Sequence, residues 1–145
     1  MFYKEVLKKI KKEGKCPFCN LKKELIISEN KYSYLTPAEA PYTKDHLLVI
    51  PKRHLIDLKD LKKKEKSAIF DLVIYGMKAL KKKYAAIELE YKEGDMKIAG
   101  KSISHAHFHL LPKSRGNQVF STNESKRRFL NKKEVIKEAN KIKKW

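Results

Sequence analysis

Long apolar segments and cysteines are scarce in this 145-residue sequence. No run of about 18 apolar residues occurs, so we expect no segment to span a membrane. Residues 1–15 also lack the unbroken apolar core of a secretory signal peptide, and their apolar residues instead recur at helical spacing. We therefore expect a cytoplasmic protein whose chain begins with a helix. Because the chain has only two cysteines, a framework of structural disulfides is not expected.

Acidic residues are also few. The 17 Asp and Glu stand against 35 Lys and Arg, which gives a formal net charge of +18. Such an excess favours partners that carry phosphate groups. The basic residues are spread along the chain, however, lysine far outnumbers arginine, and the sequence has no RNA-binding signature. Nucleic acid is therefore an open but not a favoured partner.

The remaining composition and the apolar patterns indicate one folded domain. Hydrophobic residues make up 41% of the sequence, enough to bury a core. The patterns predict strands over residues 25–36 (two, around a turn), 46–50, 85–94 and 103–112. A long helix is expected over residues 58–84, with an apolar stripe formed by Ile69, Leu72, Val73, Gly76 and Leu80. Loops are expected over residues 94–102 and 114–125, and a basic amphipathic helix over residues 126–145, with its apolar face formed by Val135, Ala139 and Ile142.

The motif CPFC contains both cysteines, Cys16 and Cys19. In a reducing compartment this C-x-x-C spacing indicates a metal site or a redox pair. A redox pair of the thioredoxin kind would follow a strand in a β-α-β unit, and that context is absent here. Two thiolates are half of a tetrahedral zinc site, so the other two ligands would come from the five histidines.

The stretch SISHAHFHLLPK places His105, His107 and His109 at every second residue. On a strand all three imidazoles would point to one face, and the outer two would lie about 13 Å apart. One zinc ion holds its nitrogen ligands at about 2.0–2.1 Å, so it cannot bind all three on a regular strand. The row therefore needs more than one role. The outer histidines can belong to different sites, and the middle one can project alone into a cleft.

The stretch DHLLVIPKRH contains the other two histidines. His46 opens an apolar strand and His54 follows just after it. A histidine at the start of a buried run is often only a satisfied core residue. In this chain it could lie beside the row of three, if the two strands are neighbours in one sheet.

Taken together, these motifs resemble those of the HIT superfamily of nucleotide hydrolases and transferases. HAHFHLL resembles the family's histidine triad, and PYTKDHLLVIPKRH resembles its apolar strand ending in Pro-Lys-x-His. A C-x-x-C near the start is typical of the zinc-bearing bacterial branch. The resemblance covers residues 16–112 and implies an α+β fold, with an antiparallel sheet of about five strands packed by the long helix. The implied organisation is an N-terminal helix (1–15), a HIT domain (16–115) and a basic C-terminal extension with a helix (116–145).

The resemblance implies a division of labour among the histidines. His107 would attack phosphorus and form a covalent nucleotidyl-histidine, because an unprotonated imidazole nitrogen is a good nucleophile near neutral pH. His109 and His46 would hydrogen-bond around the phosphate and fix the tautomer of His107. Ser102 would face the phosphate, and Lys101, where the family often has Gln, could neutralise it.

The resemblance also implies one structural zinc ion per chain. Its ligands would be Cys16, Cys19, His54 and His105, a closed Cys₂His₂ set with no position left open for water. Two further positions depart from the family pattern. Ala38 stands where the family commonly has Asn, and Asp45 stands where it commonly has Gly before His46. These departures leave the catalytic set complete and the nucleoside preference open.

The expected function is hydrolysis or transfer at the α-phosphorus of a nucleoside phosphate derivative. The substrate would be a phosphoramidate, a dinucleoside polyphosphate or an adenylylated adduct. One alternative is an aprataxin-like deadenylase that acts on nucleic-acid ends, which the charge of +18 favours. The other is a non-catalytic, zinc-stabilised nucleotide-binding module. Related proteins are often two-fold dimers, and we expect a homodimer here.

Overall fold

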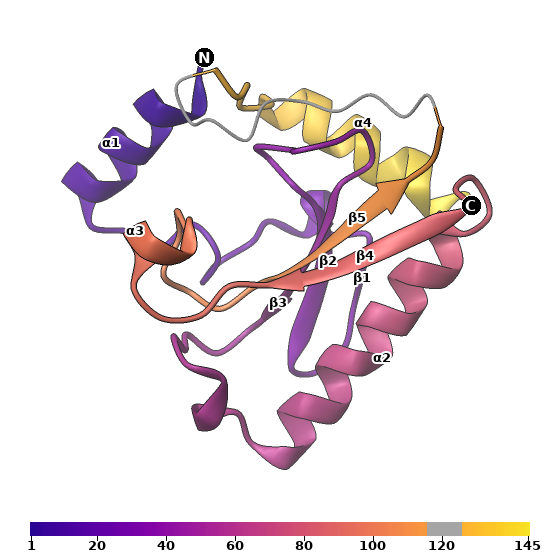
Figure 1. The fold of residues 1–145 in the computed structure, drawn as a ribbon, viewed down its shortest axis with the longest axis horizontal. Helices are drawn as coiled ribbons and strands as arrows, with labels where there is room; N and C mark the ends of the chain where they lie inside the picture. The colour runs from indigo at the N-terminus through magenta and orange to yellow at the C-terminus, as the bar shows by residue number, and fades with distance from the viewer. Residues whose placement is uncertain (116–125) are drawn as a thin grey trace.

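A five-stranded antiparallel sheet forms the centre of the protein (Figure 1). This computed structural model describes residues 1–115 and 126–145. The strand order is β1-β2-β3-β5-β4. The strands are β1 (Ser28–Glu29), β2 (Ser33–Pro37), β3 (Leu47–Pro51), β4 (Ala86–Tyr91) and β5 (Phe108–Lys113). The predicted α+β class and the number of strands are confirmed.

The two faces of the sheet have different neighbours. Leu47 and Val49 of β3 belong to the main buried cluster, together with apolar residues of the long helix α2. Leu48 and Ile50 alternate with them and form a second cluster, against which Phe18 packs. Since successive side chains of a strand point to opposite faces, α2 covers one face and the other is left for the segment around Phe18.

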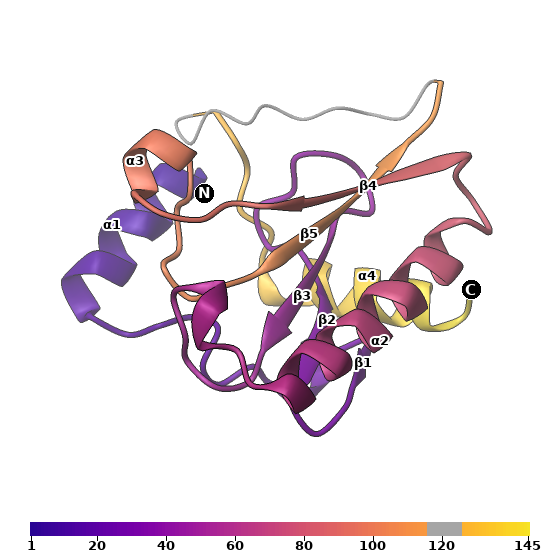
Figure 2. The ribbon, with the colours of Figure 1, turned by 60° about the horizontal axis from the view of Figure 1, so that its bottom comes forward.

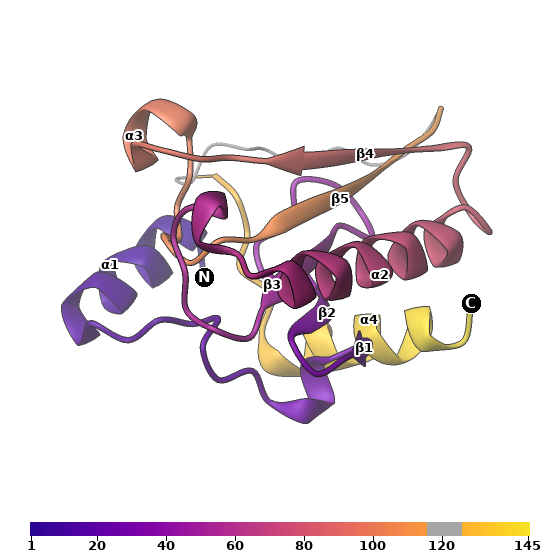
Figure 3. The same cartoon turned by 90° about the horizontal axis from the view of Figure 1, so that it is seen from below.

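Helix α2 (Lys63–Leu80) packs across β2, β3 and β5 (Figure 3). The predicted apolar stripe, including Gly76, is buried. A Cβ at Gly76 would lie 2.6 Å from a methyl carbon of Leu110, so glycine allows the helix to approach the sheet closely. The helix begins later than predicted because Leu58–Asp60 forms a separate 3₁₀ turn, η2. The backbone N–H of Lys62 donates to the Glu65 carboxylate, and this bond caps the start of the helix. The same carboxylate also accepts two hydrogen bonds from Arg53.

The two terminal helices lie apart, the first beside a short helix and the last beside α2 (Figure 3). Helix α1 (Tyr3–Glu13) lies beside the short helix α3 (Met96–Ala99), which occupies part of the segment predicted as a loop (Figure 2). A 3₁₀ turn, η1 (Lys23–Leu25), precedes β1. Helix α4 (Lys132–Lys143) buries its predicted apolar face in the space beside α2, against β2 and η1 (Figure 3).

In the C-terminal region the helix starts later than predicted, and most of the segment predicted as irregular lies outside the described residues. Helix α4 starts at Lys132 rather than at residue 126, because the side chain of Asn131 accepts the N–H of Glu134 and caps the helix there. Of the segment predicted as irregular, residues 116–125 lie outside the described residues. Within the described ranges no helix has the length and apolar character that crossing a bilayer requires.

Candidate functional site

A cleft on the face of the sheet away from α2 brings His46, His107 and His109 together. His46 precedes β3 directly and His109 lies on β5, the neighbouring strand. The cleft draws its walls from distant parts of the chain. Its other lining residues include Tyr3, Ile10, Phe18, Ala38, Tyr42, Leu48, Ser102, Ile103, Arg127 and Phe129.

The row of three histidines is not one continuous strand. Strand β5 begins only at Phe108, so the strand prediction is wrong for residues 103–107. The backbone of Ala106 donates instead to the carbonyl of Leu55, at 2.8 Å. His105 Nε2 donates to the carbonyl of Pro51, also at 2.8 Å, at the point where β3 ends. These bonds hold the segment off the sheet ladder, and His105 faces a different site from His107 and His109.

Hydrogen bonds assign the tautomers of His46 and His109. The backbone N–H of Tyr42 donates to His46 Nδ1 at 3.0 Å, so this nitrogen carries no proton. The proton of the neutral ring is therefore on Nε2, which donates to His109 Nδ1 at 2.9 Å. His109 in turn must carry its proton on Nε2. That N–H is left available as a donor to a bound ligand.

His107 has the complementary arrangement. Its Nδ1–H donates to the carbonyl of His105 at 2.8 Å, which leaves the lone pair on Nε2. The ring is buried and lies 4.9 Å from the ring of His109 and 5.1 Å from that of Phe18, measured between centroids. The cleft thus holds one ring nitrogen with a free lone pair beside one ring nitrogen with a free proton.

Burial keeps all three cleft histidines neutral. It lowers the pKa of His46 to about 3, that of His107 to about 4 and that of His109 to about 2. Neighbouring positive charges lower these pKa values further: Arg127 and Lys92 act on both His46 and His109. A neutral imidazole at His107 is the form that can act as a nucleophile.

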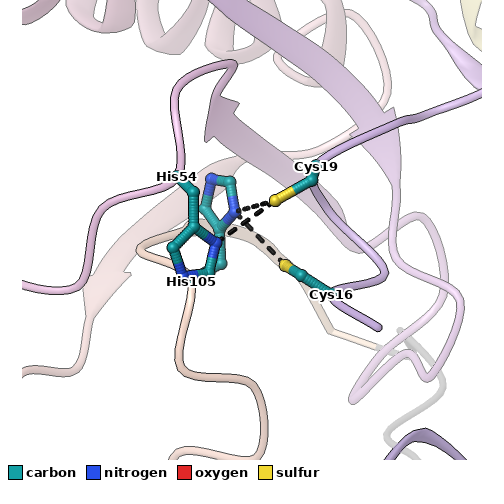
Figure 4. A group of neighbouring side chains, drawn as sticks. All are labelled: Cys16, Cys19, His54 and His105. Atoms are coloured by element: carbon teal, nitrogen blue, oxygen red, sulfur yellow. Dashed lines mark hydrogen bonds between the residues drawn. The ribbon is translucent and has the colours of Figure 1, made fainter. Parts of the chain in front are cut away.

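Four predicted metal ligands form a second group beside the cleft (Figure 4). The ligand atoms of Cys16, Cys19, His54 and His105 all lie within 4.8 Å of one another. His105 Nδ1 lies 3.4 Å from the Cys16 sulfur and 3.7 Å from the Cys19 sulfur, and His54 Nδ1 lies 3.2 Å from the Cys19 sulfur. Tetrahedral zinc with bonds of about 2.0–2.3 Å places its ligand atoms about 3.3–3.8 Å apart. These three contacts are close to that spacing, and the remaining pairs lie within 4.8 Å.

The chemistry of the four ligands also fits a metal ion. Because His105 donates through Nε2, its Nδ1 lone pair points toward the cysteines. Burial, together with the neighbouring Cys16, raises the pKa of the metal-free Cys19 thiol to about 11. A bound cation reverses this effect, because a coordinating thiol loses its proton. The group could therefore hold one tetrahedral metal ion.

The two predicted substrate-binding residues occupy different places. Ser102 lines the cleft, and its hydroxyl lies 2.8 Å from the hydroxyl of Tyr3. Lys101 is buried and does not line that cleft. It borders a hollow between α1, α3 and the metal ligands, with its Nζ 6.0 Å from the ring of Tyr91.

Several cleft residues could not be predicted from the motifs. Tyr42 stacks on His109, with ring centroids 5.4 Å apart, and Arg127 packs on Tyr42. Tyr3 and Arg127 come from the two terminal segments, which the backbone joins through a 2.8 Å bond from Tyr3 N–H to the Arg127 carbonyl. Their only signal in the sequence is an aromatic or basic side chain near a chain end, which is too common to point to a site.

Asp45, one of the departures from the family pattern, has φ of 62°. In the described residues it is the one non-glycine with positive φ, a conformation that Asp tolerates better than most residues. Its buried carboxylate accepts hydrogen bonds from Tyr84, just after α2, and from Lys141 of α4, the latter at 2.7 Å. Asp45 thus connects the residue before His46 to the C-terminal helix.

Comparisons with known proteins agree with the motifs. A family model for the HIT domain matches residues 20–116. An uncharacterised HIT-like protein of Mycoplasma genitalium is 30% identical over 115 residues, 77% of this chain and 82% of that protein. Adenosine 5′-monophosphoramidase of Saccharomyces cerevisiae is 32% identical over 108 residues, 70% of this chain and 64% of that enzyme. The structure of a zinc-bound histidine triad family protein from Mycobacterium smegmatis is similar in fold, with a TM-score of 0.62 and 19% identity over 97% of this chain and 92% of that one.

Proposed function

Because the chain belongs to the HIT domain family, we propose that it is a nucleotide hydrolase or nucleotidyl transferase with His107 as its nucleophile. The reaction takes place at the α-phosphorus of a nucleoside phosphate derivative. One observation carries the proposal: in a single cleft the lone pair of His107 Nε2 is free, and the proton of His109 Nε2 is free beside it. The similarity to a yeast phosphoramidase supports the class of reaction.

In the first step the Nε2 lone pair of His107 attacks the α-phosphorus. A P–N bond forms, and the bond from phosphorus to the leaving nitrogen or oxygen breaks with its electron pair on the leaving group, which takes up a proton from water. The Nδ1–H bond to the carbonyl of His105 stabilises the positive charge that develops on the ring of His107. His109 donates its Nε2–H to a phosphoryl oxygen, where negative charge increases in the transition state.

In the second step a water molecule attacks the same phosphorus. The P–Nε2 bond breaks, its electron pair returns to His107, and the proton of the water is released with the nucleoside monophosphate. If another nucleophile replaces water, the same intermediate gives nucleotidyl transfer. His46 holds the proton of His109 on the correct nitrogen through both steps, because its own tautomer is fixed by the backbone of Tyr42.

We also propose that Cys16, Cys19, His54 and His105 hold one zinc ion. With four protein ligands the ion leaves no position for water or substrate, so its role is structural. Bound there, it ties the segment after α1 to the residues that precede β5. The carbonyl of His105 that orients His107 belongs to one of these ligands, so loss of the metal would loosen the support of the nucleophile.

A substrate panel tests the proposed function. Purified protein is incubated with an adenosine phosphoramidate, a dinucleoside polyphosphate and a 5′-adenylylated DNA, and released AMP is measured by chromatography. Release from either of the first two supports the proposal. Release from the DNA alone would favour a deadenylase that acts on nucleic-acid ends. No release from any of the three, with intact zinc and fold, would favour a non-catalytic module.

A homodimer is also proposed. β4 is an edge strand of the sheet, and it exposes Leu89. Helix α2 exposes Phe70, Ile74 and Tyr75, each about half accessible. Phe70 and Ile74 are four residues apart on α2 and so share one face of the helix, and large apolar side chains that cluster on a surface often mark an interface. Light scattering of the wild-type protein and of the double variant Phe70→Glu, Ile74→Glu tests the interface. A wild-type dimer that becomes a monomer in the variant supports it, and a wild-type monomer contradicts it.

A further inference from the structure

Arg127 is a buried cation in the wall of the cleft, outside the residues matched by the family model. Its side chain is 4% exposed, and its guanidinium carbon lies 4.4 Å from the ring centroid of Tyr3 and 4.5 Å from that of Tyr42. Both rings therefore lie against the guanidinium. Such stacking fixes its orientation and reduces the side-chain entropy that binding a ligand would otherwise cost.

Although Glu39 lines the same cleft, this cation has no salt-bridge partner in the described part of the chain. There its Nε has no hydrogen-bond partner, although the atom is fully buried. None of the ion pairs found among the same residues includes Arg127, whereas the next residue, Arg128, pairs with Glu134. A buried charge that is neither paired nor hydrogen-bonded is expensive, and arginine cannot lose its proton to reduce that cost. An anionic ligand in the cleft would supply the missing partner.

The position of Arg127 indicates which part of a substrate it meets. Tyr42 contacts Arg127 and also the rings of His46 and His109, with centroid distances of 5.0 and 5.4 Å to the two histidines. Arg127 is therefore about one aromatic ring removed from the histidine pair. The phosphorus that bonds to His107 must sit beside His107 and His109. A leaving group that extends from this phosphorus toward Tyr42 would place its first phosphate nearer to the guanidinium.

We propose that Arg127 binds a second phosphoryl group and makes the site selective for substrates whose leaving group carries phosphate. The preferred class is a dinucleoside polyphosphate or a related nucleoside polyphosphate, rather than a phosphoramidate of a neutral amine. The planar fork of arginine can give two parallel hydrogen bonds to phosphate oxygens. The inference rests on the proposed function, and it narrows that function to one class of substrate.

The experiment compares two substrates across three variants. kcat/KM is measured with diadenosine triphosphate and with adenosine phosphoramidate for wild type, Arg127→Gln and Arg127→Lys. The matched control is Arg128→Gln. It removes the same charge from the next residue, whose side chain is 70% exposed. For Arg127→Gln we expect a loss of about 10- to 100-fold with the triphosphate, the usual effect of one charged hydrogen bond, and less than threefold with the phosphoramidate. Arg127→Lys should recover part of the loss, and Arg128→Gln should match wild type.

Two kinetic results would overturn the inference. Equal loss with both substrates, together with a lower melting temperature, would show that Arg127 only clamps the terminal segments. Unchanged kinetics with the triphosphate would show that it does not bind phosphate. Calorimetry with ADP and AMP separates this inference from the proposed function, because it needs no turnover. Arg127→Gln should weaken ADP binding by at least tenfold and leave AMP binding within threefold, even if the wild-type protein hydrolyses neither substrate. Equal weakening of both would also contradict the proposal.

Discussion

Replacing Lys141 by methionine tests how the C-terminal helix supports the catalytic face. Lys141 Nζ lies 2.7 Å from the Asp45 carboxylate, and the two side chains are 35% and 3% exposed. A hydrogen bond to a charged group contributes about 1.5–3 kcal/mol, and partial exposure of one partner reduces this toward the value of a surface pair. We therefore expect Lys141→Met to lower the free energy of unfolding by about 1–2 kcal/mol. For a domain of this size, each kcal/mol lowers the melting temperature by about 2–4 °C.

A double-mutant cycle isolates this interaction. Asp45→Asn keeps the shape of the side chain and tolerates positive φ, but it removes the charge that Lys141 contacts. Urea unfolding of the two single variants and the double variant should give a coupling energy of about 1–2 kcal/mol. Lys133→Met is the control, since Lys133 lies on the exposed side of the same helix. A coupling energy within error of zero would refute the idea that α4 holds Asp45 through Lys141.

The pH dependence of the coupling follows from the pKa of Asp45. Burial alone would raise this pKa, but hydrogen bonds from Lys141 and Tyr84 outweigh burial and lower it below the ordinary value of 3.8. Because the folded-state pKa is the lower one, the stabilisation is present above about pH 3.8 and is lost as the pH falls through the folded value. The coupling energy should therefore stay constant from pH 8 to pH 5. A steady decline across that range would contradict the assignment.

Two further outcomes are expected. In the double variant Cys16→Ser, Cys19→Ser, metal analysis should show no zinc where the wild-type protein has one ion per chain. The melting temperature should also fall, because the binding free energy of a structural metal is also folding free energy. Unchanged zinc content would show that the ligands are elsewhere. Burial lowers the pKa of His46 to about 3 and that of His109 to about 2. Below pH 6.5 these two histidines therefore bind protons in the unfolded chain but not in the folded one. As a result, the free energy of unfolding should fall by about 1–2 kcal/mol per histidine between pH 6.5 and 5. Urea titrations at several pH values should show a shallower fall for His109→Asn, and identical slopes for variant and wild type would contradict this reasoning.

Much of the site could be predicted from local patterns. The C-x-x-C spacing and the alternating histidines each limit which atoms can share a metal ion. The resemblance to the HIT family then points to His54 and His105 among the five histidines, and the structure brings these two together with Cys16 and Cys19. The stripe on α2 follows from helical periodicity, which depends only on neighbours along the chain.

The parts that could not be predicted depend on contacts between distant segments. Alternation suggested a strand through His105, but the bonds from His105 and Ala106 to Pro51 and Leu55 remove this segment from the ladder. No local pattern encodes those partners. Likewise, Arg127 lines the cleft in a segment that pairs with the backbone of Tyr3, across more than 120 residues of chain.

The central claim is that His107 forms a covalent bond to the nucleotide. Its most direct test is mass spectrometry of a reaction with an adenosine phosphoramidate or a dinucleoside polyphosphate, quenched within the first turnover and digested to peptides. We expect an adenylyl adduct on the peptide that contains His107, and none in His107→Ala protein that retains its fold and zinc. An adduct on His105 or on a lysine, or full turnover by His107→Ala, would contradict the account.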